Sequence, residues 1–322
     1  GSARDRLLRW HAGRLVKRFR SILVVPVTTR SDPPTALTEA VALAKASGAE
    51  VGLMGHLADV PASQLEATPR EQRSQLRRHQ VDFLTDRLTG WVEQVSDRRV
   101  PVEIVGASLP AEVADRVVRD SRDLVLVAED GSGESSAATL RLVRACPCPV
   151  WLLRPNFTGR RVLAAVDPDQ NPRTNRLILE LARSQAELHD GVLHVMHAWE
   201  LAGLESIERG VPDIMAPDDV ARYVSNVESA HRASFERTLH EAGVFEAATT
   251  HFVDGPAERA IQGLTVLYRT DLLVIGAGVT DQPQLGLGST AEQILAGTQG
   301  SVLVVKAPGD VPTGIGLRGS GG

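Results

Sequence analysis

The chain repeats one pattern of short apolar segments at an offset of about 140 residues. Residues 21–27 (SILVVPV) match residues 161–167 (RVLAAVD), and three further matches follow in the same order. These pair residues 109–112 with 255–258, 123–128 with 271–276, and 149–153 with 301–305. Self-similar segments that recur in the same order mark a repeated structural unit. The sequence therefore predicts two copies of one fold.

Within each copy, continuous apolar segments alternate with helix patterns. The segments are rich in Val, Leu and Ile, as is typical of strands covered on both faces of a parallel sheet. Helical spacing connects Leu37, Ala40, Val41 and Ala44 in the first copy and Ile178, Leu181 and Ala182 in the second. The alternation favours an α/β fold: two doubly wound five-stranded parallel-sheet domains packed as a pseudo-twofold pair.

The repeat also sets the expected domain limits. We expect a basic N-terminal helix over residues 1–20, a first domain over 21–155, a second over 160–307 and a disordered glycine-rich tail over 308–322. The basic helix could dock on its own domain or lie on an anionic membrane or partner. Docking is the favoured interpretation, since a short basic helix binds membranes weakly without a second anchor.

Charge, apolar runs and cysteines narrow the class of protein. A formal net charge of -5 gives no general attraction to nucleic acid. The apolar runs are too short to span a bilayer, so we expect no integral membrane contact. Cys146 and Cys148, in Cys-Pro-Cys-Pro, are poor disulfide partners for each other and fit buried free thiols. We therefore expect a cytoplasmic protein.

The second copy carries a glycine-rich loop where ligands bind in open parallel sheets, beyond the carboxyl end of a strand. The strand ending at Ile275 runs into Gly276 and Gly278; nine residues later, Gly288-Ser289-Thr290 opens a helix pattern. Glycines permit close backbone approach, and the free amides of a helix start attract phosphate. Ser289 and Glu292 also fit a capping box, which would consume those amides within the helix.

The first copy lacks these features. Ala128 and the pair Glu129-Asp130 replace the opening glycines, and Val27 stands where the second copy has Asp167. Two carboxylates at this position would repel a phosphate. We therefore expect the second copy alone to bind a nucleotide in this way.

With its loop spelled Gly276-x-Gly278-x9-Gly288-Ser289, the C-terminal half resembles a universal stress protein domain, whose signature is Gly-x2-Gly-x9-Gly-Ser/Thr. The whole chain resembles the tandem, two-domain members of that family, whose fold is adenine nucleotide alpha hydrolase-like. The resemblance implies that Asp167 and Val195, which we expect to end adjacent strands, hold adenine. It also implies that the glycines, Ser289 and Thr290 hold ribose and phosphates. The first gap in the signature is one residue short, which could narrow the phosphate turn.

The resulting hypothesis is a stress-response protein whose C-terminal domain binds ATP, ADP or AMP, with or without Mg²⁺, for sensing rather than catalysis. An unidentified protein partner and a homodimer accompany this expectation. The alternative is a scaffold with a degenerate pocket that holds no nucleotide, or another phosphorylated or lipid-like metabolite. An adenylate-transferring enzyme would need a catalytic motif that the sequence lacks. A metal site at His189, His194 and His197 is disfavoured, because residues three apart on a strand face opposite sides.

Overall fold

A computed structural model describes residues 19–27, 33–57, 69–106, 108–129, 137–201, 217–278 and 287–306. The expected N-terminal helix and the C-terminal tail lie outside these residues. The chain forms two compact units. Unit 1 contains the residues up to Phe157 together with those from Ala277 onward, and unit 2 contains Thr158–Gly276.

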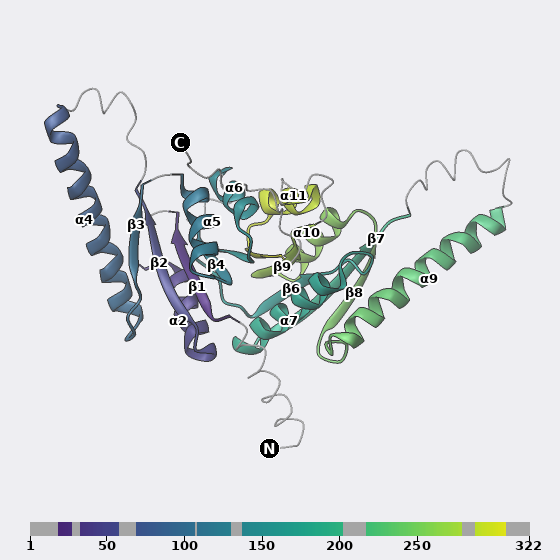
Figure 1. Ribbon diagram of the computed structural model, residues 1–322. Helices are drawn as coiled ribbons and strands as arrows, with labels where there is room; N and C mark the ends of the chain where they lie inside the picture. Colours follow the sequence, from purple (N-terminus) through teal and green to yellow (C-terminus); the bar gives the residue numbers. More distant parts are fainter. Residues whose placement is uncertain are drawn as a thin grey trace, which may run out of the picture. The chain divides into compact units, whose positions relative to one another are not determined.

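Unit 1 is an α/β unit whose strands run in the order β3-β2-β1-β4-β5-β10. Figure 1 labels the first four of these strands and the helices beside them. The first five strands are parallel, and β10 pairs antiparallel with β5. The strands are β1 (Ser21–Pro26), β2 (Glu50–His56), β3 (Val102–Val105), β4 (Leu124–Ala128), β5 (Val150–Leu153) and β10 (Ser301–Val305). The helices are α2 (Thr35–Ser47), α4 (Arg70–Val95), α5 (Leu109–Arg119), α6 (Ala137–Ala145) and α11 (Ser289–Gly297).

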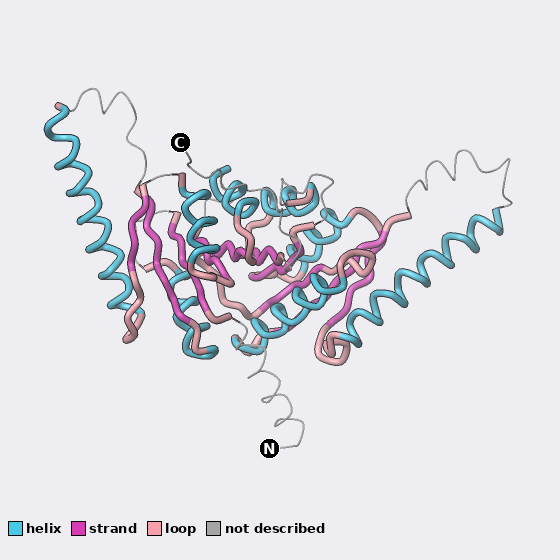
Figure 2. The backbone as a smooth tube through the Cα atoms, in the orientation of Figure 1, coloured by secondary structure: helices cyan, strands magenta, loops and turns pink. Residues whose placement is uncertain are grey.

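Unit 2 has four parallel strands in the order β9-β6-β7-β8. These are β6 (Arg161–Ala165), β7 (Val192–Trp199), β8 (Thr249–Asp254) and β9 (Leu272–Gly276). The helices are α7 (Pro172–Leu188), α9 (Pro217–Glu241) and α10 (Ala257–Leu267). Figure 2 shows the alternation of strand and helix that the sequence pattern predicts.

The strand positions predicted from the apolar segments are confirmed. Residues 22–25 of β1 and 124–127 of β4 are at most 3% exposed, as are 162–164 of β6 and 272–275 of β9. Helices cover these strands: α2 packs on β1, β2 and β4, and α7 packs on β6, β7 and β9. Burial on both faces explains why these segments are continuously apolar rather than alternating.

One polar contact recurs at equivalent positions of the two copies. Asp123, just before β4, accepts hydrogen bonds from the backbone N–H groups of Arg20 (2.7 Å) and Ser21 (3.1 Å) where β1 begins. Asp271, just before β9, accepts from the Arg161 N–H at 3.0 Å and from the Thr158 hydroxyl. Each aspartate ties the start of one strand to its neighbour, so the duplication extends to side-chain chemistry.

The compact units do not follow the repeat in the chain. The last helix and strand of the second copy, α11 and β10, group with unit 1. The reason is the pairing of β10 with β5, which is antiparallel and places Leu303 opposite Trp151. In addition, the Arg154 N–H donates to the Ser301 hydroxyl at 3.1 Å. The domain limits 21–155 and 160–307 therefore remain a prediction from the repeat.

Among the helices that the structure describes, none combines the length and apolar character needed to cross a bilayer.

Candidate functional site

The two ends of the glycine-rich loop meet at its base. The Gly288 N–H donates to the Ala277 carbonyl at 2.7 Å, and the Ala277 N–H donates to Val305 of β10 at 3.0 Å. Gly278 has φ +80°, and a Cβ atom there would lie 3.3 Å from the Gly288 Cα. Position 278 therefore requires glycine for its conformation and for the close approach. Residues 279–286 of the loop lie outside the described residues.

Helix α11 begins directly beyond this turn with its first amides uncapped. Gly288 is the N-cap residue, with φ −76° and ψ 159°, and no side chain among the described residues caps the helix. Glu292 does not reach back to the helix start, because its carboxylate accepts from Arg144 Nη2 at 2.6 Å and Nε at 2.9 Å. The capping-box interpretation of Ser289 and Glu292 is therefore wrong.

The start of α11 has the electrostatics of an anion site. Uncapped N–H groups and the positive end of the helix dipole favour a negative group. Ser289 and Thr290 are exposed in the first turn, so their hydroxyls are accessible to a ligand. This arrangement can hold a phosphate without any lysine or arginine.

Asp167 lies just beyond β6 in unit 2, and its carboxylate already has internal partners. One oxygen accepts from the Asp169 N–H at 3.1 Å and the other from Gln170 Nε2 at 2.7 Å. The Asn175 side-chain amide, in turn, bonds to the backbone N–H and carbonyl of Asp167. Asp167 is half-buried, and a ligand that bonds to its carboxylate would compete with Gln170.

Val195 does not end its strand as expected. Strand β7 continues to Trp199, and Val195 is fully buried opposite Ala164. The Val166 N–H donates to the Met196 carbonyl, so the parallel register carries Asp167 to the level of Ala198. The expectation was wrong because the run 192–199 contains two similar triplets, Leu-His-Val at 193–195 and Met-His-Ala at 196–198. The sequence pattern does not show which triplet ends the strand. Ala198, which is half-buried, is the residue that lies level with Asp167.

Ile275 and Gly276, also predicted to bind the nucleotide, lie at the end of β9. Ile275 is 3% exposed within the strand and Gly276 is its last residue. The eight predicted residues are therefore divided by the compact units: Asp167, Val195, Ile275 and Gly276 belong to unit 2, and Gly278, Gly288, Ser289 and Thr290 belong to unit 1.

In the first copy, a buried ion pair follows the equivalent strand. Glu129 Oε2 lies 3.3 Å from Arg154 Nη2, and the two side chains are only 7% and 8% exposed. The counterpart loop from Asp130 to residue 136 lies outside the described residues. Arg154 neutralises Glu129. Of the two carboxylates expected to repel a phosphate, Glu129 therefore no longer contributes a net charge.

The histidines on β7 face opposite sides of the sheet, as predicted. His194 Nδ1 lies 2.9 Å from His251 Nε2 and stacks on Tyr268, whereas His197 lies near His231 and Phe235 of α9. Burial lowers the pKa of His194, His197 and His251. No cluster of three or more His, Cys, Asp or Glu side chains within the described ranges could hold a metal ion.

The cysteines are buried free thiols, as the sequence predicted. Burial raises the pKa of Cys146 to about 12 and that of Cys148 still further. Lys306 is also buried, and its ammonium donates to the carbonyls of Val143, Arg144 and Cys146 at the C-terminal end of α6. Burial lowers the pKa of Lys306. These groups fasten a helix end, and the thiols are too protonated to act as nucleophiles.

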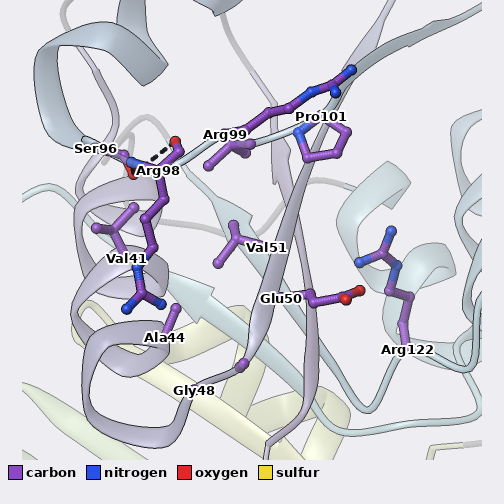
Figure 3. Close-up of a pocket in the computed structure, with 12 residues that line it drawn as sticks. Val41, Ala44, Gly48, Glu50, Val51, Ser96, Arg98, Arg99, Pro101 and Arg122 are labelled. Atoms are coloured by element: carbon purple, nitrogen blue, oxygen red, sulfur yellow. Dashed lines mark hydrogen bonds between the residues drawn. The ribbon is translucent and has the colours of Figure 1, made fainter.

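Unit 1 also contains a cavity of about 460 Å³, at the amino ends of β2 and β3 (Figure 3). In the close-up, Arg98 points toward Ala44 and Gly48 at the end of α2, Arg99 points away, and Glu50 faces Arg122. Arg122 is held by Asp120 at 3.3 Å. Ligands of parallel sheets bind at the opposite, carboxyl ends of the strands, so this cavity is not the predicted nucleotide site.

Comparisons with known proteins relate this chain to proteins of similar length and fold. Residues 159–306 match the model of the Universal stress protein family. Universal stress protein E of Salmonella typhi is 24% identical over 304 residues, covering 89% of this chain and 94% of that protein. Universal stress protein E of Escherichia coli K12 is also 24% identical, with the same coverage of each chain.

Two solved structures share the fold. A functionally unknown protein from Pseudomonas aeruginosa PAO1 superposes with a TM-score of 0.65 at 20% identity, covering 90% of this chain and 93% of its own. A universal stress protein from Archaeoglobus fulgidus gives a TM-score of 0.55 at 16% identity, covering 88% and 96%.

Proposed function

We propose that this chain, whose residues 159–306 match the Universal stress protein family, binds an adenine nucleotide through the glycine-rich loop of its second copy and acts in a stress response by sensing rather than by catalysis. The observation that carries the proposal is the uncapped start of α11, beside the contact between Gly278 and Gly288. A helix start whose amides lack a side-chain cap, while Glu292 is held by Arg144, favours an external anion.

The base end of the proposed site is Asp167, together with Ala198 rather than Val195. The register between β6 and β7 supports this choice, because it places Ala198 level with Asp167 near the end of β7. The Asp167 carboxylate would accept from the adenine amino group once Gln170 gives way. With no lysine after the glycines and no pair of nucleophile and base, hydrolysis of a bound triphosphate would be slow. Mg²⁺ would be held chiefly by the phosphates.

The test is a thermal shift with ATP, ADP and AMP, with and without Mg²⁺, on the native chain and two variants at one position. Gly288→Asp places a carboxylate at the N-cap, where it accepts from the α11 amides and occupies the phosphate position. Gly288→Ala leaves the amides free and adds no charge. At a ligand concentration of 100 times Kd, binding stabilises by about 2.7 kcal/mol.

We expect Gly288→Asp to retain its stability and lose the nucleotide response, while Gly288→Ala keeps the response. If no nucleotide stabilises the native chain, the protein is the scaffold with a degenerate pocket that the sequence left open as an alternative. The expected homodimer and protein partner would be sought by light scattering and copurification under the same nucleotide conditions.

A further inference from the structure

Unit 2 contains a second cavity, in the groove between the start of α7 and the last turns of α9. Its volume is about 440 Å³. Helices α7 and α9 contact each other. Three guanidinium-bearing residues line the cavity, Arg173 and Arg176 from α7 and Arg237 from α9, and Glu241 is the single acidic residue of the lining. The cavity is therefore basic.

Two of the three arginines lack a counter-charge. Arg176 donates to Glu180 at 2.8 Å, one turn along α7. Neither Arg173 nor Arg237 forms an ion pair with any residue that the structure describes. The positive charge of the groove is thus left for a ligand or for solvent.

The two arginines of α7 that line the groove stand at the wrong end of their helix for stability. The first turn of a helix favours acidic side chains, because the dipole is positive there. The first turn of α7 holds no acidic residue and instead carries Arg173. A bound anion would compensate both the dipole and the guanidinium groups, which is a reason for their position that helix stability does not supply.

The first copy gives an internal control. Helix α2 (Thr35–Ser47), the counterpart of α7, contains no arginine, and neither do residues 88–95 of α4, the counterpart of the last turns of α9. Among the described residues of these helices, the basic groove belongs only to the copy with the glycine-rich loop. Its wall includes Asn175, 4% exposed, whose amide bonds to the backbone of Asp167. Occupancy of the groove can therefore act on the Asp167 loop.

We propose that this groove is a second anion site, which binds a small ligand carrying a phosphate or pyrophosphate group. Cavities of about 300–1,000 Å³ are typical of small-molecule sites, so the volume suits such a ligand. Guanidinium groups recognise phosphate oxygens through paired hydrogen bonds, and Ser234 in the lining adds a hydroxyl. The site is separate from the glycine-rich loop and does not require it.

Calorimetric titration of the full chain with inorganic pyrophosphate tests the proposal. The reference protein is the Gly288→Asp variant, whose loop is silenced, so failure of the nucleotide hypothesis and failure of this one remain distinguishable. Arg173→Gln/Arg237→Gln is then added to that background. The matched control adds Arg119→Gln/Arg222→Gln, which removes two exposed arginines, one from each unit, that do not line the groove.

We expect the groove variant to weaken pyrophosphate binding by at least about tenfold, because it loses charge-assisted hydrogen bonds to the ligand. The control variant should bind as the reference does. If the groove variant binds pyrophosphate as tightly as the reference does, the proposal is overturned. An equal loss of affinity in the groove and control variants would also overturn it, since that would indicate general charge attraction. An absence of binding to the reference would overturn it as well.

Discussion

The two copies differ most where the fourth strand of each gives way to its loop. In the first copy, the Glu129 N–H donates to the Leu153 carbonyl at 2.9 Å; in the second, the Ala277 N–H donates to Val305 at 3.0 Å. These matching bonds make Ala277 the counterpart of Glu129. They also make Lys306, which follows Val305, the counterpart of Arg154.

This difference decides whether the base of the loop carries fixed charges. In the first copy, the carboxylate and the guanidinium neutralise each other at the base of the loop. In the second, alanine removes the carboxylate, and the lysine is withdrawn to the carbonyls at the end of α6. The base of the second loop is left with glycine backbone and helix amides, which are the groups that the proposed phosphate site uses.

The largest effect is expected at the buried ion pair between Glu129 and Arg154 of the first copy. Arg154→Ala leaves Glu129 as an uncompensated buried charge, and such losses cost about 3–5 kcal/mol of unfolding free energy. Glu129→Ala/Arg154→Ala should recover much of that loss, because neither charge remains. Urea denaturation of the native chain and both variants measures this. If Arg154→Ala costs less than the double variant, the pair does not neutralise the first loop as described.

Gly278→Ala tests the close approach in the second loop. A residue with φ +80° pays about 1–2 kcal/mol when it gains a Cβ, and here the Cβ would also meet Gly288. Gly48→Ala is the control, because Gly48 has φ +78° in the same unit and no atom within 4 Å of the added Cβ. We expect the greater loss of stability, and the only loss of nucleotide response, in Gly278→Ala. Equal responses would show that backbone strain accounts for the whole effect.

Acid should loosen unit 2 more than unit 1. Burial lowers the pKa of His194, His197 and His251 below the unfolded value of 6.5. The unfolded chain therefore binds more protons below that pH, and stability is lost as the pH falls through 6.5 toward the folded-state pKa values. Hydrogen exchange, corrected for its intrinsic rate, compares peptides of the two units. His194→Phe/His251→Phe should reduce the acid effect; an unchanged effect would exclude this pair as its source.

The smallest effect is expected at the partly exposed ion pair between Arg144 and Glu292. The Arg144 and Glu292 side chains are 36% and 33% exposed, so solvent screens their attraction. Arg144→Gln should cost no more than about 1 kcal/mol by the same urea measurement. It also releases Glu292 at the start of α11, where its carboxylate can compete with phosphate. Weaker nucleotide binding in Arg144→Gln would support this role, whereas tighter binding would contradict it.

Sequence reasoning succeeded where the pattern is local and failed where two elements had to be placed against each other. The apolar runs gave the strands, and the order of matches gave the duplication. The level of Val195 could not be predicted, because it depends on the register between β6 and β7. The capping box failed for the same reason: Arg144, distant in the chain, holds Glu292.

The sequence alone determined the repeated α/β fold, since strand burial and helix periodicity are written in consecutive residues. It also determined the place of the glycine-rich loop, since the positive φ at position 278 favours glycine. Tertiary structure decided which charges remain unpaired. The partners of Glu129, Glu292 and Lys306 come from segments far along the chain, and ion pairing depends on distance in space rather than in sequence.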